Sequence, residues 1–269
     1  MSNLKIGIIG AGKMAGAIVK GWVTSDLVPA AQVLASVPER DSALLDPLRE
    51  LGCETTHDNL ETINNTDVVV LGVKPFVIPL VAKELKDKGK GQLLISVAAG
   101  IDTQKIQLMF GSTWRMVRAM PNTAVTVGEG ATVYCLGPGA EHSDGMIVQK
   151  LFSSLGYCAR VQESQIDAVT GVSGSGPAYM YLILEAMADE GVRQGLDRQT
   201  SYQLAAQTMV GAGRMVLNTG SHPGVLKDEV TSPGGSTAAA LRALELGGLR
   251  GTMMSAVSAA ADRCRDMNN

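Results

Sequence analysis

The spacing of hydrophobic and polar positions changes at about residue 162. Before that point, short apolar runs alternate with amphipathic stretches, as in a parallel β-sheet covered by helices on both faces. Residues 68–71 and 93–95 are wholly apolar, which is typical of strands buried on both faces. Residues 1–162 are therefore expected to form a doubly wound α/β domain with a mostly parallel sheet. The predicted strands are 4–9, 32–36, 67–73, 92–97 and 114–120, with weaker candidates at 131–135 and 158–161.

From about residue 163 the alternation gives way to helical periodicity. The spacing predicts helices at 175–194, 197–218, 236–246 and 249–265, several with wide apolar faces rich in small residues. An all-α domain of residues 163–269 with such faces would be marginal alone. We therefore expect it to pack against a second copy of itself and to form a homodimer.

The first predicted strand runs into a glycine-rich turn and then an amphipathic stretch. Gly10 and Gly12 permit a tight turn, and the small Ala15 lets the following helix press on the strand. Backbone N–H groups at the start of that helix suit a pyrophosphate. Gly-x-Gly-x-x-Ala in this strand–turn–helix context indicates a Rossmann domain that binds a dinucleotide, against the alternative of a purely structural βα turn.

The end of the second strand bears on which dinucleotide binds. Domains specific for NAD usually carry Asp or Glu there, to bind the ribose 2′-hydroxyl. This strand ends in Ser36 with Arg40 close behind, which favours the 2′-phosphate of NADP. Glu39 leaves the use of NAD open. Asn59 is a candidate contact on the adenosine side.

Two further strand ends carry candidate contacts, because ligands of doubly wound sheets lie beyond the carboxyl ends of the strands. Lys74 precedes the turn-fixing Pro75 and is placed to reach ribose or phosphate, unless it is simply an exposed loop lysine. The tiny side chains at 98–100 let a flat ring lie against the backbone. Residues 118–123 form a polar turn that a structural role explains equally well.

Two turns of the second half, 171–179 and 230–237, are rich in glycine and hydroxyl side chains. Ser175 and Ser236 fit N-caps of the helices that follow. Capping does not explain the Pro-Gly-Gly-Ser-Thr run at 233–237, whose successive N–H groups form a nest for a carboxylate. Thr237 could then offer its hydroxyl to a neighbouring atom of the same substrate.

Composition excludes several classes of protein. The 269-residue chain is 45% hydrophobic and 18% charged, as expected of a soluble globular protein with two domains. A net charge of −3 gives no basic surface for nucleic acid, and no apolar run reaches the ~18 residues of a membrane span. Four scattered cysteines and three histidines form no metal-binding pattern. The first strand leaves no room for a presequence, so we expect a cytoplasmic protein, with a mitochondrial location left open.

Motifs from both halves together resemble pyrroline-5-carboxylate reductase. They occur in the order typical of that family, from about residue 4 to residue 265. They are Gly10-x-Gly12-x-Met14, Val73-Lys74-Pro75, Ala98-Ala99-Gly100, Met120-Pro121-Asn122-Thr123, Gly174-Ser175-Gly176-Pro177-Ala178-Tyr179, His222-Pro223-Gly224 with Leu226-Lys227-Asp228 and, above all, Ser232-Pro233-Gly234-Gly235-Ser236-Thr237.

The resemblance implies NAD(P)H-dependent reduction of the C=N bond of 1-pyrroline-5-carboxylate to L-proline, the last step of proline synthesis. Ser36 and Arg40 tilt the cofactor toward NADP, with NADPH preferred and NADH use left open. The resemblance also implies a homodimer that can assemble into a decamer of five dimers. By position, Gly235, Ser236 and Thr237 would hold the substrate, with Thr237 catalytic through a hydrogen bond to the ring nitrogen. The implied cofactor contacts, besides Ser36, are Gly10, Ala11, Gly12, Lys13, Met14, Asn59, Gly72, Val73, Lys74, Pro75, Val97, Ala98 and Ala99.

The chain departs from the family pattern at Val37, where many members carry a hydroxyl residue beside the 2′-phosphate. This weakens the assignment of NADP. The reaction itself suits the residues present, because a cyclic imine is readily protonated and its iminium carbon accepts hydride. Such an enzyme needs alignment more than a strong acid, which fits a site without an obvious histidine or carboxylate dyad.

Two other functions remain open. A 3-hydroxyacid dehydrogenase has a similar architecture, but that family's pattern implies a lysine base on a helix of the second domain. Past Lys150 this chain has only Lys227, in a turn-like segment. A non-catalytic NADP sensor is the second alternative, although a pure dimerisation surface needs no carboxylate nest.

Overall fold

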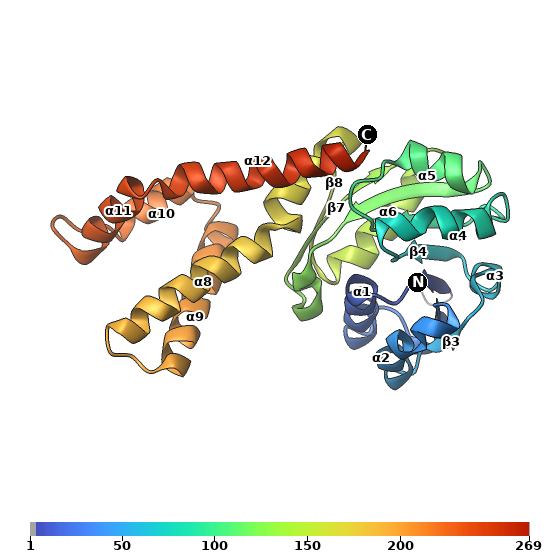
Figure 1. Ribbon diagram of the computed structural model, residues 1–269, viewed down its shortest axis with the longest axis horizontal. Helices are drawn as coiled ribbons and strands as arrows, with labels where there is room; N and C mark the ends of the chain where they lie inside the picture. Colours follow the sequence, from blue (N-terminus) through green and yellow to red (C-terminus); the bar gives the residue numbers. More distant parts are fainter. Residues whose placement is uncertain (1–3, 269) are drawn as a thin grey trace. The chain divides into compact units, whose positions relative to one another are not determined.

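A computed structural model describes residues 4–268, and its first part is built on one eight-stranded sheet (Figure 1). The strand order is β3-β2-β1-β4-β5-β6-β7-β8, and all pairs are parallel except β6 with β7. The α/β fold with a mostly parallel sheet is therefore confirmed. The strands are β1 (Ile6–Ile9), β2 (Val33–Ser36), β3 (Glu54–Thr56), β4 (Val68–Leu71), β5 (Leu93–Ser96), β6 (Arg115–Met120), β7 (Gly130–Leu136) and β8 (Gly156–Arg160).

Helices cover both faces of the sheet. Successive side chains of β1 and β4 point to opposite faces of the sheet. Ile8 and Val70 therefore lie in one apolar cluster, and Ile9 and Leu71 lie in another. The first cluster includes side chains of α1 (Lys13–Thr24), α2 (Asp46–Glu50) and α6 (His142–Ser153). The second includes side chains of α3 (Asn59–Asn64), α4 (Ile78–Leu85) and α5 (Thr103–Phe110).

The central strands end in register at one edge of the sheet. Ile9 of β1 pairs with Ser36 of β2 on one side and with Leu71 of β4 on the other. The residues that follow these strands therefore leave the sheet side by side. This edge carries the glycine-rich turn and most of the predicted cofactor contacts.

By its internal contacts the chain divides into two compact units. The first is Met1–Ser175 with Ser258–Asn269, and the second is Gly176–Val257. The domain boundary predicted at 162/163 marks where the strands end and remains a prediction. Between β8 and the second unit lie α7 (Ile166–Val169) and a π-helical turn, Thr170–Gly174. Short 3₁₀ helices occur at Ala30–Gln32, Glu39–Leu45, Pro75–Val77, Thr123–Val127 and Glu163–Gln165.

The second unit is helical, as predicted. It contains α8 (Gly176–Arg193), α9 (Arg198–Thr219), α10 (Pro223–Glu229) and α11 (Ser236–Leu246), and α12 (Leu249–Asn268) begins in it. Few of its side chains are buried, and many large apolar ones are exposed. None of the helices in residues 4–268 combines the length and apolar character that a membrane crossing requires.

Candidate active site

The turn between β1 and α1 has the geometry of the dinucleotide fingerprint. Gly10 has φ +89°, and a Cβ there would lie 2.5 Å from Val73 Cγ1. Its N–H donates to the carbonyl of Ser36 at 2.8 Å. A Cβ on Gly72 would lie 2.6 Å from Ala15 Cβ, so the turn, the helix and the end of β4 pack without room for larger groups. The glycines and Ala15 therefore serve the close packing that the sequence predicted.

The start of α1 has the properties of an anion site. Its N-cap is Gly12, which provides no side-chain cap, and the first turn contains no acidic residue. The first backbone N–H groups of a helix have no acceptor within the helix. The space beside Gly12 is open, because a Cβ built there would meet only Gly72 O within 4 Å, at 3.8 Å. Gly12 to Met14 thus fit the pyrophosphate of a dinucleotide, with Lys13 exposed beside them.

The polar side chain at the end of β2 is buried and hydrogen-bonded to a neighbouring residue. Ser36 is 0% exposed, and its Oγ donates to Asn59 Oδ1 at 2.7 Å. Asn59 is half-buried, and its Nδ2 donates to Glu84 Oε2 at 2.8 Å. Val37 is also buried, so its side chain contributes no polar group. Arg40 is exposed, with Nε 3.7 Å from Asp41 Oδ2.

The ends of β4 and β5 bring small and basic residues to the same edge. Gly72 and Val73 are half-buried, and the N–H of Gly72 donates to Ile9 O at 2.8 Å. Lys74 is exposed, and its Nζ lies 5.8 Å from the centroid of the Phe76 ring. Pro75 opens the 3₁₀ turn that leads into α4.

Beyond β5, Val97 and Ala99 are half-buried and Ala98 is buried. The chain then turns at Gly100, which has φ +71°. Small side chains therefore line this stretch, as a ring stacked against the backbone requires.

The hydroxyl-rich turn of the second unit lies before α11. The N-cap of α11 is Gly235, without a side-chain cap, so the alternative in which Ser236 caps the helix is wrong. Gly234 has φ +68°, and the N–H of Gly235 donates to Ser232 O at 3.0 Å. Within residues 4–268 no acceptor is found for the N–H groups of Ser236, Thr237 and Ala238 or for the hydroxyls of Ser236 and Thr237. The turn therefore offers several donors to one small anion.

The turn after β6 has a structural role. Asn122 is buried, and its Oδ1 accepts from the N–H groups of Ala124 and Ala131, both at 3.2 Å. Its Nδ2 donates to the carbonyl of Ser173 at 3.1 Å. The exposed His57 donates from Nδ1 to Val37 O at 2.9 Å, a contact that a surface histidine makes without a catalytic role.

A buried arginine was missed by the sequence analysis. The side chain of Arg118 in β6 is 3% exposed, 3.6 Å from Glu163 and 3.4 Å from Asp167. Glu163 in turn accepts from both the N–H and the hydroxyl of Thr103, each at 2.7 Å. The available signal was a charged residue in the middle of a strand whose other central residues are apolar. These charges join β6 and α5 to the segment that follows β8.

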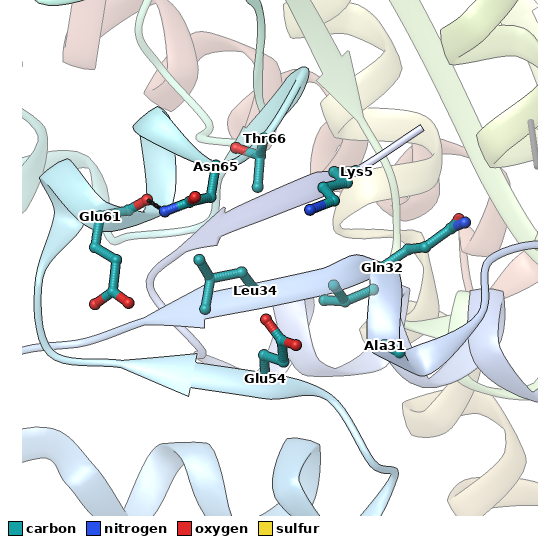
Figure 2. Close-up of a pocket in the computed structure, with 9 residues that line it drawn as sticks. Lys5, Ala31, Gln32, Leu34, Glu54, Glu61, Asn65 and Thr66 are labelled. Carbon is teal, nitrogen blue, oxygen red and sulfur yellow. Dashed lines mark hydrogen bonds between the residues drawn. The ribbon is translucent and has the colours of Figure 1, made fainter. Parts of the chain in front are cut away.

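A cavity of about 170 Å³ lies at the other end of the strands. It is lined by residues at or before the amino ends of β1, β2 and β3 and by part of α3 (Figure 2). Lys5 and Glu54 point toward it, while the Asn65 amide donates to the backbone of Glu61 (Figure 2). The cavity is thus separate from the glycine-rich turn. No group of three metal-binding side chains is found in the part of the chain that the structure describes.

Two models of known protein families match the chain, one in each of its parts. The model described as "Pyrroline-5-carboxylate reductase dimerisation" matches residues 163–267. The model "NADP oxidoreductase coenzyme F420-dependent" matches residues 5–100.

Individual relatives match this chain over nearly its full length. The chain is 46% identical to pyrroline-5-carboxylate reductase of Arabidopsis thaliana, over 99% of this chain and 96% of that protein. It is 41% identical to human pyrroline-5-carboxylate reductase 2, over 99% of this chain and 84% of that protein. The chain belongs to the pyrroline-5-carboxylate reductase family.

Solved structures from the pyrroline-5-carboxylate reductase family share the fold. The Plasmodium falciparum enzyme with NADP bound superposes with a TM-score of 0.91 at 33% identity, and the match covers 100% of both chains. The Coxiella burnetii enzyme gives 0.90 at 36% identity, again over 100% of both chains. The resemblance inferred from the motifs is therefore confirmed.

Proposed function

We propose that this protein reduces the C=N bond of 1-pyrroline-5-carboxylate to L-proline with NADPH as hydride donor. Family membership and the NADP-bound structural relative support the reaction and the cofactor. The observation in this structure that carries the proposal is the uncapped turn at 232–237, because its free N–H and hydroxyl groups suit a small carboxylate.

The cofactor is assigned to the carboxyl edge of the sheet. Gly10 to Met14 would hold the pyrophosphate, and Ser36, acting through Asn59, would serve the adenosine ribose. Lys74 would contribute a positive charge. The rest of the cofactor site would be lined by Gly72, Val73, Pro75 and the run Val97 to Ala99. When bound there, the reduced nicotinamide supplies the hydride.

The substrate is assigned to the turn before α11. The N–H groups of Ser236 and Thr237 would bind its carboxylate, and Gly235 allows the chain to approach closely. Thr237 Oγ1 would hydrogen-bond the ring nitrogen. The imine nitrogen takes one proton, the C=N carbon accepts one hydride, and the product is a secondary amine. Because the iminium carbon is already electrophilic, alignment by Thr237 supplies most of what the chain must add.

The helical part is assigned to self-association, since its family model is a dimerisation model. We assign residues 163–269 to this domain and 1–162 to the dinucleotide-binding domain. The homodimer would form through exposed apolar faces of the helices, and five dimers would make a decamer. A cytoplasmic location also stays a prediction, to be checked by imaging a fluorescent fusion.

Steady-state assays test the proposed reaction directly. The purified protein is expected to oxidise NADPH when 1-pyrroline-5-carboxylate is present, with slower turnover using NADH. Assays with 3-hydroxyisobutyrate and NADP⁺ run in parallel. Turnover of the hydroxy acid alone would overturn the proposal in favour of a hydroxyacid dehydrogenase, and no turnover of either substrate would favour a sensor.

Replacing Thr237 tests its catalytic role. Thr237→Val removes the hydroxyl and keeps the shape, so kcat is expected to fall about 100-fold, the usual scale for one positioned proton donor. Thr237→Ser keeps the hydroxyl and should retain most of the activity. Since Gly235 rather than Thr237 caps α11, the melting temperature should change little. Equal rates for the two variants would remove Thr237 from the chemistry.

A further inference from the structure

The Asn59 amide is held by side chains from two other elements. Ser36, the last residue of β2, donates to its Oδ1 at 2.7 Å. Glu84, near the end of α4, accepts from its Nδ2 at 2.8 Å. Asn59 is the first residue of α3, so one side chain links three elements at the predicted adenosine site.

Glu84 determines which way this amide faces. An ionised carboxylate only accepts hydrogen bonds, so the nitrogen of Asn59 must face Glu84 and its oxygen must face Ser36. The Ser36 hydroxyl then has to donate. A neutral partner at position 84 would accept either orientation of the amide, because an amide presents both a donor and an acceptor. The charge of Glu84 thus fixes the whole chain of hydrogen bonds.

The same charge lies close to the end of β2, on the far side of Asn59. In dinucleotide-binding domains the end of β2 serves the adenosine ribose at its 2′ position. Here Ser36 is buried and its hydroxyl is occupied, so the exposed Arg40 and the half-buried Asn59 are the polar groups beside this strand end. Glu84 lies one hydrogen bond beyond Asn59. Within residues 4–268 Glu84 forms no ion pair. Its negative charge therefore disfavours a 2′-phosphate bound beside Asn59 relative to an uncharged 2′-hydroxyl.

We propose that Glu84 is a positioning residue that orients Asn59 and lowers the preference of this protein for NADPH over NADH. It replaces, from α4, the carboxylate that is missing at the end of β2. The inference rests on the proposed function only for its kinetic readout, because cofactor binding can be measured without substrate.

Equilibrium binding of NADP⁺ and NAD⁺ by calorimetry is the primary test. Glu84→Gln is expected to raise the ratio of NADP⁺ affinity to NAD⁺ affinity about three- to tenfold, the scale of one screened charge at this range. Glu84→Asp keeps the charge and should restore a ratio close to that of the unaltered protein. Glu50→Gln, at the exposed end of α2, removes the same charge elsewhere and should leave the ratio unchanged.

Kinetics with both cofactors separate this role from a structural one. Glu84→Gln should shift KM for NADPH relative to KM for NADH, with kcat and the melting temperature close to those of the unaltered protein. An unchanged or lowered affinity ratio overturns the proposal, whatever happens to activity. Failure of the unaltered protein to reduce the imine would overturn the proposed function and leave the binding test of Glu84 intact.

Discussion

At the scale of single residues, the most heavily constrained charges lie outside the predicted site. Arg118 is buried between Glu163 and Asp167, and its Nε has no hydrogen-bond partner among the described residues. A buried arginine with two carboxylates holds position well, but it tolerates the loss of one partner badly, because the others remain desolvated. Arg118 is therefore one of the side chains that attach the segment after β8 to the sheet.

Replacing Arg118 should destabilise the protein strongly. Arg118→Met leaves two carboxylates in a half-buried site, and we expect the free energy of unfolding to fall by about 3 kcal/mol. Urea denaturation followed by circular dichroism measures the change. Arg49→Met breaks the exposed pair with Asp46 and should cost less than about 1 kcal/mol. Equal losses for the two variants would mean that Arg118 does not hold this segment.

At the scale of elements, the segment from β1 through α1 allows a sharper comparison, because Gly10 in its turn and Gly16 in the helix α1 have opposite environments. Gly10→Ala forces φ +89° on a residue with a Cβ and places that Cβ 2.5 Å from Val73 Cγ1. We expect a stability loss of about 1–3 kcal/mol and a raised KM for NADPH. Gly16→Ala adds a Cβ with no atom within 4 Å inside the same helix, and should stabilise by about 0.5–1 kcal/mol. Thermal unfolding and cofactor titration of both variants check the pair, and a neutral Gly10→Ala would contradict it.

The sequence predicted those elements whose pattern is local. Apolar runs gave seven of the eight strands, and caps and periodicity gave α8, α9 and α11 within about two residues. β3 was missed because Glu-Thr-Thr at 54–56 is short and polar, and only pairing with β2 makes it a strand. The π-helical turn at Thr170–Gly174 has no periodic signature in the sequence. Its Gly174 lies close against β6, since a Cβ there would be 2.6 Å from Met120 Cε.

The predicted site residues also divide into those with a local signal in the sequence and those whose contacts appear only in three dimensions. Gly10, Gly12 and the run 232–237 could be chosen from the sequence, since glycine and hydroxyl patterns report backbone geometry directly. Glu84 could not, because a glutamate on an amphipathic helix looks the same whether it faces water or an amide from α3. Ser36 was chosen for the right strand end, but its burial and its hydrogen bond to Asn59 appear only in three dimensions.

At the scale of the whole molecule, we expect two buried thiols and one half-buried thiol to set an alkaline limit to stability. Burial raises the pKa of Cys53, Cys135 and Cys158 from 9.0 to about 11 each. A thiol whose pKa is higher in the folded state stabilises that state fully below pH 9, and the contribution is lost as pH rises through 11. The melting temperature in reducing buffer should therefore fall between pH 9 and 11. The triple variant with alanine at these positions should show a shallower decline, and parallel curves would contradict this account.

Self-association is the remaining property of the whole molecule, and α9 allows it to be tested. Leu204 and Leu217 of α9 are exposed in the single chain, Leu217 by 79%, so replacing both with lysine should cost a monomer little. If a second copy covers these faces, the same lysines would be buried without partners and association would fail. Sedimentation equilibrium should then show a monomer with unchanged helix content by circular dichroism. Leu108→Lys, equally exposed at 78% but on α5 of the sheet unit, should keep the oligomer. An oligomer that survives the double variant at unchanged mass would mean that α9 lies outside the interface.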